Sequence, residues 1–215
     1  MRVWREALGA VAVAWICVCS TPVAQAAEQR AAADVADIQM SADARFALQW
    51  IQAMRDNRGM PFAIVDKKDA RVFVYDARGH LVGATRALLG MARGDHSVPG
   101  IGDVPPARIP VADRTTPAGR FVTEPGENHL GEHVVWFDYG AALAIHRVRP
   151  DAARDARLQR LASGRPDAQR VSAGCVVVPV SFYEDVVRPT LGRRRGVVYV
   201  LPETRPVKDM FTADL

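Results

Sequence analysis

Residues 62–76 read FAIVDKKDARVFVYD, and this stretch contains two β-prone runs separated by a polar turn. Phe62–Asp66 and Arg71–Asp76 are rich in β-branched and aromatic side chains, which favour strands. A second turn at Asp76–Gly79 leads into the shorter run His80–Gly83. The pattern predicts a β-meander near the start of the folded domain.

Strand-like runs recur along the rest of the chain, and they predict a mainly β domain with a few helices. Residues 84–110 carry several Gly and Pro residues, so we expect mostly loop there, with one helical turn near Ala87–Met91. The further strand-like runs are 121–122, 134–137, 141–145, 175–180 and 197–201.

The beginning of the chain has the features of a secretory signal peptide. Arg2 and Arg5 precede the apolar run Ala7–Cys19, and the small-x-small pattern Ala24–Ala26 follows it. The apolar run is shorter than the roughly 18 to 20 residues of a spanning helix. We therefore interpret residues 1–26 as a cleaved signal peptide, which predicts a periplasmic or otherwise exported protein that keeps no membrane span.

The remaining residues are predicted to form a linker, 27–40, and one catalytic domain, 41–215, because 215 residues suit one medium domain. Ser41 fits the N-cap of an amphipathic helix over residues 41–57. The polar segment 149–170 is predicted to be an inserted helical segment.

One more short helix is expected near the C-terminal end of the domain. Ser181 is predicted to cap it, and the helix should end before Pro189.

Charge gives little support for a polyanionic partner. The chain has 28 Lys and Arg residues against 24 Asp and Glu residues, a formal net charge of +4. The run Arg193–Arg195 could attract an anionic polymer, but such runs are usually solvated loops. Because export also argues against nucleic acid, we expect none as a partner, and the sequence leaves the oligomeric state open.

Cysteine usage singles out Cys175. Cys17 and Cys19 would leave with the signal peptide, so the exported protein would hold one thiol without a disulfide partner. A buried structural cysteine is one interpretation. However, Gly174 precedes it at the entry to a β-branched strand, where the backbone can turn tightly and present amides to an oxyanion.

A nucleophilic cysteine needs a base, because a thiol of ordinary pKa is mostly protonated at neutral pH. His146 follows the apolar run 141–145, so its imidazole would emerge at a strand end. We therefore take His146 as the candidate base, although a histidine in such a place can also be structural.

The chain resembles the L,D-transpeptidases with a YkuD-type catalytic domain over roughly residues 61–201. The shared features are a Val-Asp strand end, a Val-x-Val-Tyr-Asp strand, a Thr-Pro-x-Gly-x-Phe loop, a strand leading into His, and a Ser-x-Gly-Cys motif. In this sequence they read Ile64-Val65-Asp66, Val72-Phe73-Val74-Tyr75-Asp76, Thr116-Pro117-Ala118-Gly119-Arg120-Phe121, Ile145-His146 and Ser172-Ala173-Gly174-Cys175.

The resemblance implies a β-sandwich catalytic domain that acts on peptidoglycan stem peptides by ping-pong acyl transfer, without cofactor or metal. The Cys175 thiolate would attack a peptide bond, release the terminal D-residue and pass the acyl group to an amine. His146 would be the general base, oriented by the backbone carbonyl of Arg147. Ser172, Ala173 and Gly174 would support the nucleophile.

The chain departs from the family pattern at three places. Ala173 stands where most members have His, and Val177 stands where Asn or Arg is common. The separation between His146 and Cys175 exceeds the common spacing, and we attribute the excess to the segment 149–170. These changes fit a divergent subgroup, and they also fit a noncatalytic module that binds peptidoglycan.

Two enzymatic alternatives remain open at the level of sequence. Water could accept the acyl group, which would make the protein an L,D-carboxypeptidase or hydrolase of the same fold. Residues 129–133 have the His-x-x-Glu-His order of some zinc peptidases. Gly131 lies inside this motif and a strand-like run follows it, so we expect a loop entering a strand rather than a zinc-binding helix. His129 and His133 would then line the substrate cleft or lie on the surface.

Overall fold

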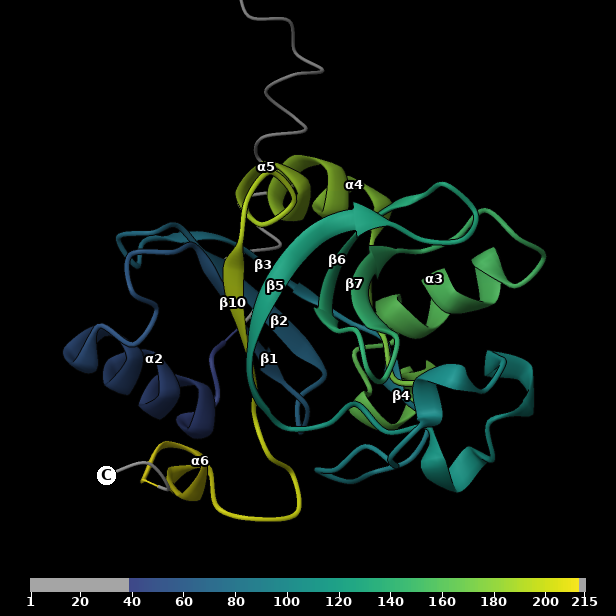
Figure 1. The fold of residues 1–215 in the computed structure, drawn as a ribbon, viewed down its shortest axis with the longest axis horizontal. Helices are drawn as coiled ribbons and strands as arrows, with labels where there is room; N and C mark the ends of the chain where they lie inside the picture. Colours follow the sequence, from purple (N-terminus) through teal and green to yellow (C-terminus); the bar gives the residue numbers. More distant parts are fainter. Residues whose placement is uncertain (1–38, 213–215) are drawn as a thin grey trace, which may run out of the picture. The chain divides into compact units, whose positions relative to one another are not determined.

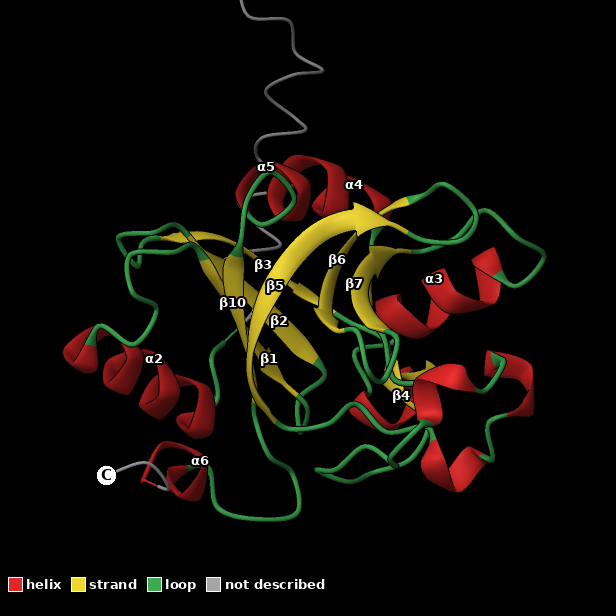
Figure 2. Cartoon of the chain, in the orientation of Figure 1, coloured by secondary structure: helices red, strands yellow, loops and turns green. Residues whose placement is uncertain are grey.

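Eight strands form one sheet in the order β3-β2-β1-β10-β5-β6-β7-β9 (Figures 1 and 2). The computed structural model describes residues 39–212, so the predicted signal peptide and nearly all of the predicted linker lie outside the described residues. The strands are β1 (Phe62–Asp66), β2 (Arg71–Tyr75), β3 (Leu81–Arg86), β5 (Gly119–Glu127), β6 (His133–Asp138), β7 (Leu143–Arg147), β9 (Val176–Val178) and β10 (Gly196–Val200).

Strand β5 is shared by the two halves of this sheet. Residues 119–123 pair with β10, and residues 124–127 pair with β6. Beyond β3, Leu88 and Val177 exchange backbone hydrogen bonds of 2.8 and 2.9 Å, so the sheet almost closes on itself. The predicted mainly β class is confirmed, and the two layers of the sandwich come from one bent sheet.

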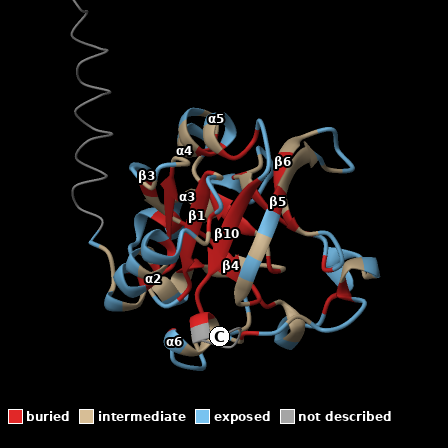
Figure 3. Ribbon diagram, turned by 60° about the vertical axis from the view of Figure 1, so that its left-hand side comes forward, coloured by how far each residue is buried: buried red, intermediate tan, exposed pale blue. Residues whose placement is uncertain are grey.

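The central strands bury both of their faces. Ala63 and Val65 of β1 face the core enclosed by the sheet, whereas Phe62 and Ile64 face a second core on the outside. Helices α2 (Ala42–Met54) and α6 (Lys208–Thr212) cover that outer face. Figure 3 shows how completely β1 and β10 are buried.

Helix α2 begins where the sequence places its cap. The Ser41 hydroxyl accepts a 3.0 Å hydrogen bond from the Ala44 amide. The helix ends at Met54 instead of 57, because Arg55 adopts a left-handed conformation with φ 52° and closes the last turn.

The prediction of a helical turn near Ala87–Met91 is wrong. Strand β4 (Leu89–Gly90) lies there and pairs with β8 (Arg170–Ser172). Leu88 and Leu89 are fully buried on opposite sides, so tertiary pairing overrides the local helical preference. The loop that follows contains three short 3-10 turns, η1 (Ile101–Asp103), η2 (Pro106–Arg108) and η3 (Val111–Asp113).

The helix expected from Ser181 also differs from the prediction. Helical structure begins at Val180, with Pro179 as its N-cap, and continues past Pro189 to Thr190. Pro189 cannot donate a backbone hydrogen bond, and a wide π turn immediately before it accommodates the gap. The parts are α4 (Val180–Phe182), η5 (Tyr183–Val187) and α5 (Arg188–Thr190).

The segment 149–170 contains the helix α3 (Arg154–Ala162) and the 3-10 turn η4 (Pro166–Gln169). Leu161 of α3 is buried against Leu88, Val148 and Val177, which form a small third core over β7 and β9. Within residues 39–212, no helix is long and apolar enough to cross a bilayer.

Candidate active site

The pairing of β7 with β9 brings His146 close to the residue that precedes β9, Cys175. The strands are parallel, with Ile145 opposite Val176 and His146 opposite Val177. Ile145 and Val176 belong to the enclosed core, whereas Val177 belongs to the small third core on the other face. Cys175 precedes Val176 and is a diagonal neighbour of His146, about 8 Å away between Cα atoms for ordinary strand spacing.

Both side chains line one pocket with a volume of about 500 Å³. The lining residues from the loop around η1 and η2 are apolar apart from Asp103, and polar lining groups come from the β5–β6 turn and from the segment after β7. Cys175 is partly exposed. A mostly apolar pocket with a few convergent polar groups is typical of a small-molecule or peptide site.

The turn before Cys175 is held by its own side chains. The Ser172 hydroxyl donates a 2.6 Å hydrogen bond to the Cys175 carbonyl and accepts a 3.1 Å bond from the Gly174 amide. Gly174 has φ +134°, and a Cβ atom there would lie 2.7 Å from the Thr115 carbonyl oxygen. The conformation of this turn therefore requires the hydroxyl of Ser172 and a glycine at position 174.

Thr116 anchors the same turn from the predicted Thr-Pro-x-Gly-x-Phe loop. Its side chain is fully buried. The Thr116 hydroxyl donates a 2.8 Å hydrogen bond to the Gly174 carbonyl and accepts a 2.9 Å bond from the Gly90 amide. One hydroxyl group thus joins β4 to the residue immediately before the cysteine.

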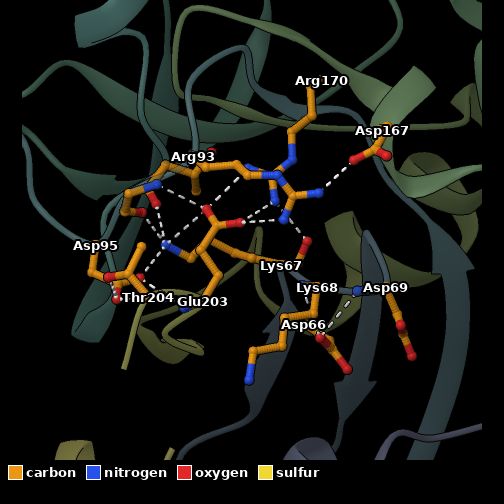
Figure 4. A network of polar contacts seen from close by, with 12 residues as sticks. Asp66, Lys67, Lys68, Asp69, Arg93, Asp95, Asp167, Arg170, Glu203 and Thr204 are labelled. Atoms are coloured by element: carbon orange, nitrogen blue, oxygen red, sulfur yellow. Dashed lines mark hydrogen bonds and ion pairs between the residues drawn. The ribbon is translucent and has the colours of Figure 1, made fainter. Parts of the chain in front are cut away.

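A buried ionic network supports Thr116 in turn (Figure 4). The fully buried Lys67 ammonium donates to the Thr116 carbonyl at 2.9 Å and to Asp95 at 2.8 Å. Glu203 lies 3.5 Å from the same ammonium and pairs with Arg170. The network joins the β1–β2 turn to the loop that holds the turn before Cys175.

The position of the His146 proton follows from its neighbour. Its Nδ1 atom lies 2.8 Å from the backbone carbonyl of Arg147. Because a carbonyl only accepts, Nδ1 carries the proton and Nε2 of the neutral ring is left as the basic atom. The Arg147 side chain points elsewhere, with its guanidinium 3.3 Å from Glu184 and 3.7 Å from Glu132.

Burial keeps both candidate residues uncharged. It lowers the pKa of His146 to about 4 and raises the pKa of the Cys175 thiol. The Ala144 amide acts in the opposite direction on Cys175 but does not outweigh burial. At neutral pH Cys175 is therefore a thiol and His146 a neutral imidazole, so an attack by the sulfur on a substrate would require transfer of the thiol proton.

The two histidines of the zinc-like motif have different surroundings. His133 opens β6, and its ring nitrogens contact the Tyr183 hydroxyl at 2.8 Å and the Gly192 carbonyl at 3.0 Å. His129 lies in the preceding turn and lines the pocket. Residues 129–133 form a turn entering a strand, and no group of three metal-ligating side chains occurs in the part of the chain that the structure describes.

The sequence did not indicate Lys67, Asp95 or the two pocket arginines, Arg149 and Arg157. Lys67 lies in a polar turn whose composition is typical of a solvated loop. Ala173 packs against the enclosed core and also lines the pocket.

Two solved L,D-transpeptidase structures are among those that the chain resembles. No family model matches the chain, and no curated protein matches it. A crystal structure of a cysteine-to-serine mutant of the Enterococcus faecium L,D-transpeptidase is 18% identical, with a TM-score of 0.37 over 66% of this chain and 50% of that chain. An NMR structure of the catalytic domain from the E. faecium L,D-transpeptidase is 17% identical, with a TM-score of 0.33 over 66% of this chain and 96% of that chain. This chain thus spans half the length of the first structure.

Proposed function

We propose that the protein is an L,D-transpeptidase-like cysteine acyltransferase that acts on peptidoglycan stem peptides through a thioester on Cys175. The observation that carries the proposal is the pairing of β7 with β9, which brings His146 and Cys175 into the lining of one pocket. The hydrogen bond from His146 Nδ1 to the Arg147 carbonyl supports it, because this bond leaves Nε2 free to accept a proton.

The first half of the reaction forms the thioester. Cys175 Sγ attacks the carbonyl carbon of a peptide bond while His146 Nε2 takes the thiol proton. The tetrahedral intermediate collapses as His146 returns that proton to the departing amine. The C–N bond breaks, the terminal residue leaves, and the acyl group remains on sulfur.

The second half transfers the acyl group to an acceptor. An amine attacks the thioester, His146 removes its proton, and Cys175 leaves as the thiol after reprotonation. An amine acceptor gives a crosslink, and water gives a shortened stem peptide. We propose export from residues 1–26, which would place the enzyme beside this substrate.

Product analysis with a defined substrate tests the proposal. The full chain is incubated with a tetrapeptide stem as acyl donor and a second stem peptide whose amine can accept the acyl group. The products are identified by mass spectrometry. Release of the terminal D-residue with crosslink formation supports acyl transfer, and release without crosslinks supports the hydrolase alternative. Neither product, together with binding to peptidoglycan that does not depend on Cys175, would favour the noncatalytic module.

Thr116→Val is expected to slow acylation of Cys175 at least about tenfold, because a small displacement of a reacting group is costly in rate. It should also lower the free energy of unfolding by about 1–3 kcal/mol, since the Gly90 amide and the Gly174 carbonyl lose their partner. Acylation by a carbapenem and urea unfolding measure the two effects. Thr116→Ser keeps the hydroxyl and should restore most of the rate. Equal rates for Thr116→Val and the unaltered protein would contradict the anchoring role.

A further inference from the structure

The segment that follows β7 covers the position beside the nucleophile and turns two arginines toward it. Leu161 of α3 packs on Val177, which is the lateral neighbour of His146. Val177 is therefore buried under α3 and offers a substrate only apolar surface. Recognition of a charged group at this side of the pocket must come from the segment above it.

Three charged side chains line the pocket: Asp103, Arg149 and Arg157. Arg149 is 34% exposed, and its Nε lies 3.1 Å from Glu132. Arg157 is 30% exposed, and its Nη1 contacts Asp151 at 2.7 Å. Each contact involves one nitrogen of a guanidinium group that has five N–H donors. Both groups can therefore bind a further anion while their present partners hold them in place.

The two arginines line the same pocket as Cys175 and His146. Arg149 influences the charge state of both Cys175 and His146, and Arg157 influences that of His146. The neighbouring wall offers the polar side chains of Asn128 and His129, whereas the single acidic side chain of the pocket belongs to the η1 turn. The guanidinium groups of the pocket therefore come from the segment that contains α3, and each has one carboxylate partner.

We propose that Arg149 and Arg157 form a carboxylate-binding subsite that orients the acyl donor over Cys175. The inference rests on the proposed function for the identity of the donor, a stem peptide with free carboxylates. Guanidinium groups suit this role because their planar fork matches a carboxylate with two parallel hydrogen bonds. The predicted insert would thus be a specificity element that compensates for the apolar Val177.

Binding to an inactive variant tests the subsite separately from catalysis. Calorimetry with Cys175→Ala measures the affinity for a tetrapeptide stem, for its C-terminal amide and for the peptide amidated on the diamino acid. Arg149→Gln with Arg157→Gln is expected to weaken binding of the free acid about ten- to a hundredfold. Amidation of the recognised carboxylate should weaken binding to a similar extent, with little further loss in the arginine variant. The two amides distinguish which carboxylate is bound.

Arg154→Gln is the matched control. Arg154 lies on α3, is exposed and pairs with its neighbour Asp155, so this variant should keep the affinity of Cys175→Ala. Arg157→Lys keeps the charge but loses the fork, and it should bind with intermediate affinity. Equal affinity of the double Arg variant for acid and amide, both at the parental level, would overturn the subsite. Peptide binding that depends on the arginines, in a protein whose Cys175 never acylates, would instead contradict the proposed function and leave the subsite standing.

Discussion

His146→Ala is expected to slow acylation of Cys175 by about 10²–10⁴-fold, the usual contribution of a positioned general base. The loss should be large because burial raises the pKa of the thiol, so little thiolate forms without a base. Stopped-flow or quenched mass measurements with a carbapenem give the rate. His80→Ala is the control, because His80 is exposed and pairs only with Asp76 in a surface turn.

The pH dependence of the same rate gives a second readout of His146. Its lowered pKa, about 4, means that the neutral, basic form persists in the folded protein as the pH falls below 6. Acylation is therefore expected to decline only as the pH approaches 4, and not near the ordinary histidine value of about 6.5. An acid limb near 6.5 that survives in His146→Ala would show that another group supplies the base.

Lys67→Met is expected to lower the free energy of unfolding by about 3–5 kcal/mol, because it leaves the buried Asp95 carboxylate without its cation. Burial opposes ionisation of Asp95, but hydrogen bonds from Lys67 and Thr204 hold the pKa of this carboxyl well below its usual range. Without the ammonium, the charge of Asp95 remains buried without the Lys67 cation, whereas Glu203 keeps its ion pair with Arg170. Urea denaturation monitored by circular dichroism measures the change.

Lys68→Met provides a control at the next residue. Lys68 is half-exposed and forms a surface ion pair of 2.7 Å with Asp43, so its loss should cost no more than about 1 kcal/mol. Similar unfolding free energies for the two variants would contradict the structural role assigned to Lys67.

Local sequence signals were sufficient to predict most of the strands, but they did not predict segments whose structure depends on tertiary pairing. The alternating or continuous apolar runs at Phe62–Asp66 and 197–201 correspond closely to β1 and β10. In contrast, Leu88 and Leu89 resemble part of a helical turn until β9 and β8 are available as partners. Likewise, the π turn before Pro189 accommodates a residue that local rules treat as a helix terminator.

The residues of the candidate site also differ in whether local sequence features indicate them. Cys175 and His146 could be singled out from the sequence because a lone thiol after glycine and a histidine near a strand end are local features, and their catalytic roles stay predictions. The network around Lys67 could not, because its members come from distant turns and become buried only when the sheet closes. The fold also explains why position 177 carries an apolar side chain, because α3 covers Val177.

Intact-mass measurement after incubation with a carbapenem tests the central claim most directly. If Cys175 is a nucleophile served by His146, the protein should gain one adduct of the mass of the carbapenem, and Cys175→Ala should gain none. His146→Ala should reach the same adduct far more slowly. A protein that never acylates, or an adduct that persists in Cys175→Ala, would contradict the account.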